Sequence, residues 1–154
     1  MNRRFSWMNT TRWIVATFTL CHFLLVFSYT IFVAYLPPYL ETKGIEGNRT
    51  GLLIGIYSLM TFPMVVLFGM LSDRFSPKRL CQLGGILYAA YAFGLSRAEL
   101  FGSFILLQIF GGAALAIGIV TLNSLYLKHL SLSNRGKKVS VFLVGSYLGF
   151  GIGP

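Results

Sequence analysis

The sequence predicts an all-α, polytopic membrane protein built as a bundle of transmembrane helices. Apolar residues make up 55% of the chain and charged residues 11%, against about 25% charged in a typical soluble domain. The charges gather in short patches, and the stretches between them carry no Asp, Glu, Lys or Arg. These stretches are 13–40, 50–72, 80–96 and 100–127. A helix needs about 20 apolar residues to cross a hydrocarbon core, so only the third stretch is short for a span.

The distribution of charge predicts the side of the membrane on which each connection lies. If the first helix starts inside, segments 1–12, 72–79 and 128–138 are cytoplasmic and hold ten of the thirteen basic residues. Such an excess marks the cytoplasmic side. We therefore expect a multi-pass protein of the bacterial inner (plasma) membrane with a cytoplasmic tail at 1–12. The net charge of +9 does not indicate nucleic-acid binding, because no soluble domain is present to carry a basic surface.

The bundle is expected over 13–154, and its first helix over about 13–36. Pro37 and Pro38 are predicted to end that helix, since proline lacks a backbone donor and disfavours helix in its predecessor. The second helix is expected over about 50–72, with Thr50 as its N-cap.

The remaining helices follow short polar connections. A third helix is expected over about 80–95 and a fourth over about 101–127; the few residues between them make the two antiparallel neighbours. A fifth begins near 139 and reaches the chain end at 154, which is short of the length of a span. We expect this helix to be incomplete and the chain to be the front part of a longer, truncated protein.

The stretch GMLSDRFSPKRL, from Gly69 to Leu80, connects the second and third helices. It resembles the loop of the major facilitator superfamily, approximately G-x-L-[ASG]-D-R-x-G-R-[RK]-x. Two positions depart from that pattern, because Ser76 replaces a glycine and Pro77 a basic residue. The matching residues are Gly69, Leu71, Ser72, Asp73, Arg74, Phe75, Lys78 and Arg79.

The resemblance implies the N-terminal half of a two-half transporter that moves a small molecule by alternating access. Its partners would be the lipid bilayer, the substrate, a coupling proton if transport is proton-driven, and the missing C-terminal half; no cofactor and no nucleic acid are implied. In the family, the acid matching Asp73 is thought to latch the cytoplasmic side through a helix dipole. The gating motif would comprise Gly69, Asp73, Arg74, Lys78 and Arg79, of which the three basic residues serve topology equally well.

A glycine stripe on the fifth helix is similar to the glycine–proline motif of proton-coupled exporters in the family. A stripe of this kind lets a neighbouring helix approach closely, and helix packing alone would account for it. Ser140 stands where those exporters carry glycine, and the comparable stretch 107–112 of the fourth helix lacks their arginine. The stripe consists of Gly145, Gly149, Gly153 and Pro154.

Polar side chains at membrane depth are the candidates for substrate or proton binding, because they are costly there unless used or partnered. The alternative for His22 is a neutral histidine bonded to a neighbouring helix. Tyr29 shares its helical face, and the same question applies to the two amides of the fourth helix. The candidates are His22, Tyr29, Gln108 and Asn123.

The function predicted from these residues is secondary active transport of a small molecule by alternating access. The fifth-helix stripe favours proton-coupled export, the missing arginine of the fourth helix argues against it, and the direction of transport stays open. An uptake permease and a non-transporting receptor or scaffold of the same fold are alternatives. An enzyme is disfavoured, because only four acids and two histidines are present and they offer neither a catalytic cluster nor a metal-ligand set.

Overall fold

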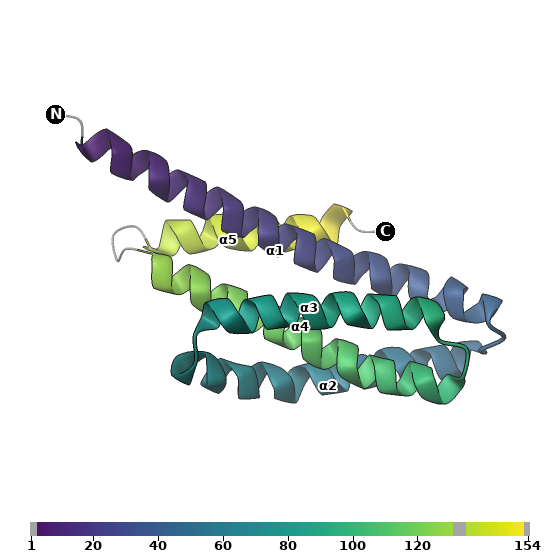
Figure 1. The fold of residues 1–154 in the computed structure, drawn as a ribbon. Coiled ribbons are helices and arrows are strands. Elements are labelled where there is room, and N and C mark those ends of the chain that lie inside the picture. Colours follow the sequence, from purple (N-terminus) through teal and green to yellow (C-terminus); the bar gives the residue numbers. More distant parts are fainter. Residues whose placement is uncertain (1–2, 131–134, 153–154) are drawn as a thin grey trace. The chain divides into compact units, whose positions relative to one another are not determined.

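The computed structural model consists of α-helices (Figure 1) and describes residues 3–130 and 135–152. No strand occurs in these two ranges, and the predicted all-α fold is confirmed. In chain order the helices are α1 (Arg3–Thr42), α2 (Gly47–Arg74), α3 (Pro77–Arg97), α4 (Phe101–His129) and α5 (Arg135–Ile152).

Three of these helices are long and apolar enough to cross a membrane: α1 from Arg12 onward, α2 and α4. The helices α3 and α5 are shorter, with 21 and 18 residues. The sequence of α5 also opens on Arg135, Lys137 and Lys138, which lowers its hydropathy. That α3 and α5 span the membrane stays a prediction.

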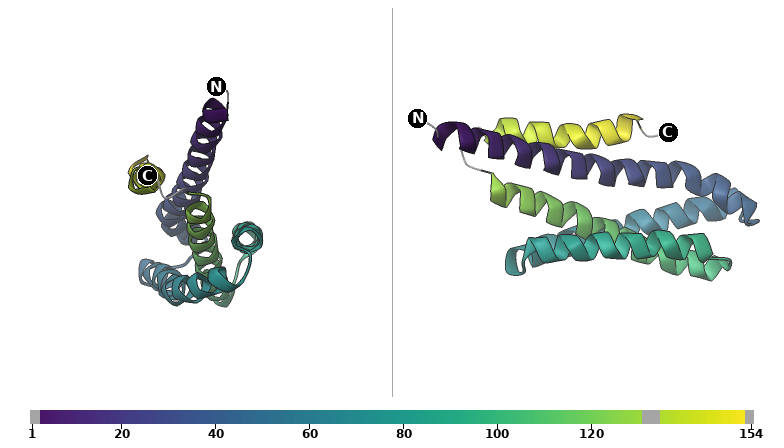
Figure 2. Two further views of the ribbon diagram at one scale, coloured as in Figure 1. Left: turned by 90° about the vertical axis from the view of Figure 1, so that its left-hand side faces the viewer. Right: turned by 45° about the horizontal axis from the view of Figure 1, so that its top comes forward.

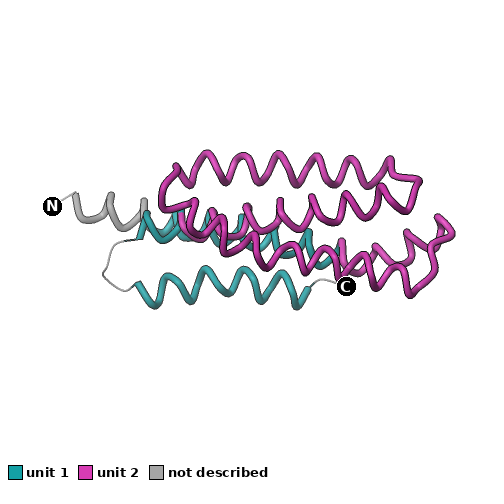
Figure 3. Tube along the Cα trace, turned by 90° about the horizontal axis from the view of Figure 1, so that it is seen from below, with its two compact units in different colours: residues 1–31, 125–154 teal, residues 32–124 magenta. Residues whose placement is uncertain are grey.

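The chain divides into two compact units (Figure 3). Unit 1 contains residues 1–31 and 125–154, and unit 2 contains residues 32–124. The first part of α1, the end of α4 and α5 therefore belong to unit 1. The end of α1, all of α2 and α3, and most of α4 belong to unit 2.

Helix α1 continues through Pro37 and Pro38, so the predicted end at these prolines needs correction. The φ angle of proline suits a helix, and its cost is a lost donor and a clash with the preceding turn. Burial offsets that cost here, because Leu36 and Leu40 lie one turn apart and are 2% and 0% exposed. The helical geometry is what places both leucines in the core of unit 2.

The actual end of α1 is set by Gly44. Its φ of +72° is a left-handed conformation that glycine adopts without steric cost. The amide of Ile45 donates to the Leu40 carbonyl at 3.0 Å, and the amide of Gly44 donates to the Glu41 carbonyl at 2.9 Å. This is the Schellman arrangement, completed by an apolar contact between the residues that flank the turn. Leu40 and Ile45 are both members of the unit 2 core.

The other helices also extend beyond their predicted bounds. Helix α2 begins at Gly47 with Glu46 as the N-cap, so Thr50 lies inside the helix. Helix α3 begins at Pro77 and α5 at Arg135. In each case the helix begins in polar or charged residues that precede the apolar run. The apolar run therefore predicts the span of a helix better than its first residue.

Within unit 2, α4 packs against both α2 and α3 (Figure 2). A Cβ atom on Gly112 would collide with the Tyr57 carbonyl oxygen of α2. A Cβ on Gly84 of α3 would lie 2.9 Å from the Gly118 amide nitrogen of α4. Glycine at these positions allows the backbones to approach closely, as small residues do between membrane helices.

Candidate functional site

In unit 1, His22 lies in the packing contact between α1 and α5. The ring is 4% exposed and stacks on Phe142, with centroids 4.2 Å apart and planes 14° from parallel. The Ser146 hydroxyl oxygen lies 3.1 Å from Nδ1 and 3.2 Å from Nε2. This geometry matches the structural alternative, a histidine bonded across to a neighbouring helix.

The His22–Phe142 stack continues onto α4. The Tyr126 ring of α4 stacks on Phe142, with centroids 4.4 Å apart and planes 16° from parallel. The Tyr126 hydroxyl donates to the Lys138 carbonyl at 2.7 Å. Phe18 of α1 contacts Tyr126 at 5.4 Å. The rings therefore join α1, α4 and α5 inside unit 1. Tyr29, the other candidate on this part of α1, is half-buried.

In unit 2, Gln108 is a fully buried amide on α4. The Tyr91 hydroxyl of α3 donates to the Gln108 Oε1 at 3.2 Å, whereas the Gln108 Nε2 has no hydrogen-bond partner among the residues that the structure describes. The Tyr91 ring lies 5.4 Å from that of Phe32 and 6.0 Å from that of Tyr57. The Gln108 amide thus contacts Tyr91, and the Tyr91 ring in turn contacts the rings of Phe32 and Tyr57. A free amide nitrogen of this kind can donate to an acceptor group.

The other amide candidate, Asn123, lies near the end of α4 in the same unit. Its Oδ1 is buried and has no hydrogen-bond partner in the described structure. The neighbouring Ser124 hydroxyl lies 2.9 Å from that of Ser72 on α2, and Ser72 is 1% exposed. Sequence reasoning treated Ser72 only as a letter of the loop motif and missed this contact between helices.

The loop motif at 69–80 covers the end of α2, the two connecting residues Phe75 and Ser76, and the start of α3. Ser76 is the N-cap of α3, and Pro77 is its first residue, where a missing donor and a fixed φ suit a helix. Ser76 and Pro77, the two departures from the family pattern, therefore form the start of α3. The charged residues of the motif are all exposed: Asp73, Arg74, Lys78 and Arg79.

The first glycine of the motif, Gly69, has an ordinary environment in unit 2. Among the described residues a Cβ there would meet only the Val120 side chain, at 3.9 Å, so no close helix approach seen in this part of the chain depends on Gly69. The close approaches are made by Gly84 and Gly112, which sequence reasoning did not single out. The signal that could have found them is the run of small residues at 111–118 on the fourth helix, which contains Gly112 and the Gly118 that Gly84 contacts.

The glycine stripe of α5 lies against α1. A Cβ on Gly145 would be 2.6 Å from the Thr19 carbonyl oxygen, and one on Gly149 would be 2.9 Å from the Val26 side chain. The Thr30 hydroxyl donates to the Gly149 carbonyl at 3.1 Å. The last two members of the predicted stripe, Gly153 and Pro154, lie outside the described residues.

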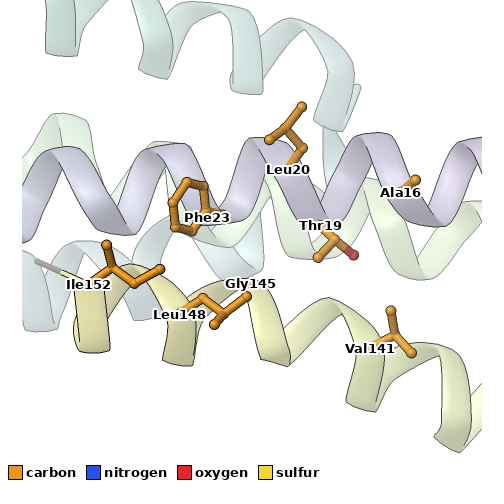
Figure 4. Close-up of a pocket in the computed structure, with 8 residues that line it drawn as sticks. All are labelled: Ala16, Thr19, Leu20, Phe23, Val141, Gly145, Leu148 and Ile152. Atoms are coloured by element: carbon orange, nitrogen blue, oxygen red, sulfur yellow. The ribbon is translucent and has the colours of Figure 1, made fainter.

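An open apolar groove of about 430 Å³ runs between the same two helices (Figure 4). It is lined by Ala16, Thr19, Leu20, Phe23, Val141, Gly145, Leu148 and Ile152. Its lining offers hydrocarbon contact and little hydrogen bonding. Over residues 3–130 and 135–152, no three His, Cys, Asp or Glu side chains come together in a group that could hold a metal ion.

Comparison with known proteins relates the chain to membrane transporters. The model of the family described as the Major Facilitator Superfamily matches residues 18–154. The Quinolone resistance protein NorA of Staphylococcus aureus is 25% identical over 135 residues, which cover 85% of this chain and 35% of NorA. The Methyl viologen resistance protein SmvA of Salmonella typhimurium is 39% identical over 85 residues, which cover 53% of this chain and 17% of SmvA.

The chain thus spans about a third of the length of NorA. The family match covers all but the first 17 residues and, with the apolar helices, makes the chain an integral membrane protein of a transporter family rather than an enzyme. The resemblance that the loop motif suggested is thereby confirmed: this chain belongs to the major facilitator superfamily.

Proposed function

We propose that the protein is a secondary transporter that exports a small organic molecule by alternating access and is driven by protons. Family membership supports secondary transport. The names of both relatives are those of resistance proteins, one for quinolones and one for methyl viologen. A membrane transporter gives resistance most directly when it removes the compound from the cell. We further propose that it works in the bacterial plasma membrane with its N-terminus in the cytoplasm.

The observation that carries the proposal is the buried, unpartnered Nε2 of Gln108. An unpaired polar group in an apolar interior costs free energy, and polar groups inside membrane helices commonly serve substrate or ion pathways. The rings of Phe32, Tyr57 and Tyr91 belong to the same unit. Aromatic side chains stack on flat rings and attract cations, which suits aromatic and cationic cargo of the kinds that the relatives are named for.

Flux measured in membrane vesicles under an imposed pH gradient tests the proposal, with a quinolone and methyl viologen as cargo. Gln108→Ala should lower the apparent affinity for cargo by roughly two- to tenfold, the worth of one hydrogen bond. Gln82→Ala is the matched control, because Gln82 is exposed on α3 and its loss should change nothing.

The same assay separates the alternatives. Flux in the direction that brings cargo into the cell would indicate an uptake permease. Flux that survives collapse of the pH gradient would exclude proton coupling. A receptor or scaffold would show no flux with any cargo. Equal effects of the Gln108 and Gln82 substitutions would remove Gln108 from the substrate site.

A further inference from the structure

Tyr91 of α3 contacts the three other helices that contribute to unit 2. Its ring lies 5.4 Å from the Phe32 ring of α1 and 6.0 Å from the Tyr57 ring of α2. On the side of α4, a Cβ atom on Gly111 would lie 2.6 Å from the Tyr91 ring, so the ring rests against the backbone of that helix. Tyr91 is 1% exposed. Close packing on three sides leaves the ring little freedom to turn.

The hydroxyl of this ring fixes one end of the Gln108 amide. It donates to Oε1 at 3.2 Å, and Nε2 has no partner among the described residues. A glutamine amide accepts at its oxygen and donates at its nitrogen, so a hydroxyl bonded the other way round would leave the oxygen unpaired instead. Gln108 is 0% exposed. Its surroundings in this conformation are therefore complete without any further part of a longer protein.

We propose that Tyr91 is a positioning residue for Gln108 and sets the selectivity of its site. By holding Oε1 it leaves Nε2 as the group offered to cargo, so molecules with a hydrogen-bond acceptor are preferred over molecules that carry only donors. The inference rests on the proposed function in one point, that cargo meets Gln108 when the helices move during alternating access. A quinolone has a carbonyl and a carboxylate and is cargo of the preferred kind. Ethidium, whose amino groups donate, is not.

The substitution Tyr91→Phe separates the role of the hydroxyl from that of the ring. The phenylalanine ring keeps the packing against Phe32, Tyr57 and Gly111, whereas the hydrogen bond to Oε1 is lost. Both ends of the Gln108 amide are then unpaired. Because the oxygen and nitrogen ends of an amide are nearly alike in shape, the side chain can turn either end toward cargo. The variant should therefore discriminate less between acceptors and donors.

Equilibrium binding to the purified full-length protein in detergent measures this selectivity, by probe fluorescence and by competition. The probes are a quinolone, ethidium and tetraphenylphosphonium, which is an aromatic cation without a hydrogen-bonding group. Selectivity is the ratio of the dissociation constant of ethidium to that of the quinolone. Tyr91→Phe should lower this ratio by roughly two- to tenfold, the worth of one hydrogen bond, and should leave the affinity for tetraphenylphosphonium unchanged.

The matched control is Tyr35→Phe, because Tyr35 belongs to the same unit and is 62% exposed; it should retain the ratio. Since Tyr91 acts through Gln108, Tyr91→Phe should change nothing further in a Gln108→Ala background. A ratio that still falls there would mean that the hydroxyl contacts cargo itself. Equal losses of affinity for all three probes would give the hydroxyl a purely structural role. Either result, or no quinolone binding to the unmodified protein, would overturn the proposal.

Side-chain amide NMR of the unmodified protein tests the same point even if Tyr91→Phe does not fold. With isotope-labelled glutamine, the signal of Gln108 is the one that Gln108→Ala removes. The quinolone should shift its amide protons downfield, as donation to an acceptor does, and ethidium should not; the reverse pattern would overturn the proposal. Both readouts are binding, so a failure of this inference and a failure of transport are seen in different measurements.

Discussion

His22, Ser72 and Gln108 are buried polar side chains, and each lies beside a polar group of another helix. Hydrocarbon offers no hydrogen bonds, so polar groups within membrane helices pair with one another. Each pair between membrane helices contributes only about 0.6 kcal/mol on average. Their effect is therefore mainly to select which helices become neighbours. The Nε2 of Gln108 and the Oδ1 of Asn123 differ from them, because neither has a hydrogen-bond partner among the described residues.

Asp73 follows buried Ser72 directly and yet is exposed at the end of α2. Asp73→Asn should lower transport turnover more than it lowers the amount of protein in the membrane, because no buried contact of unit 2 is built on this carboxylate. Turnover and abundance are measured in the same vesicles by flux and immunoblot. Glu99→Gln, which removes another exposed acid, is the control. Equal losses of turnover and abundance in Asp73→Asn would assign Asp73 a folding role.

At the scale of elements, α1 and α5 show how packing overrides local preference. The prolines in α1 argue for an end near residue 36, but burial of Leu40 in the core and the turn at Gly44 carry the helix to Thr42. Glycine is a poor helix former, yet Gly145 and Gly149 are among the residues of α5 that lie against α1. The close contact with α1 needs residues without a side chain, and this need outweighs the low helix propensity of glycine.

Gly145→Ala should destabilise the packing of α1 on α5. Its Cβ would lie 2.6 Å from the Thr19 carbonyl oxygen, and this atom belongs to the backbone, which yields little. Overpacking of this kind costs about 1–3 kcal/mol, measurable as a lower free energy of unfolding in detergent micelles. Gly151→Ala on the same helix has open space around its Cβ and should leave stability unchanged or slightly raised. The same loss in both variants would show that the effect is not steric.

For the whole molecule, the predicted topology can be tested by labelling. Single cysteines at the exposed positions Lys43 and Lys137, in a background without Cys21 and Cys81, should react with a membrane-impermeant maleimide from opposite sides. The charge asymmetry of the chain predicts that Lys137 faces the cytoplasm. Labelling of both from one side would contradict the arrangement of the helices across the membrane, and with it the orientation proposed for transport.

Sequence by itself determined that the protein is helical and embedded in a membrane, because its charge-free stretches have the length of membrane spans and a helix satisfies their backbone hydrogen bonds within one segment. It also indicated the family through the residues of the motif at 69–80, and the family match over residues 18–154 confirms that resemblance. Tertiary structure decided which side chains meet: that His22 lies against Ser146, that the Gln108 Nε2 has no partner among the described residues, and that α1 continues through its prolines. These outcomes depend on contacts between residues far apart in the chain, and helical periodicity gives the face of a residue but not its neighbour.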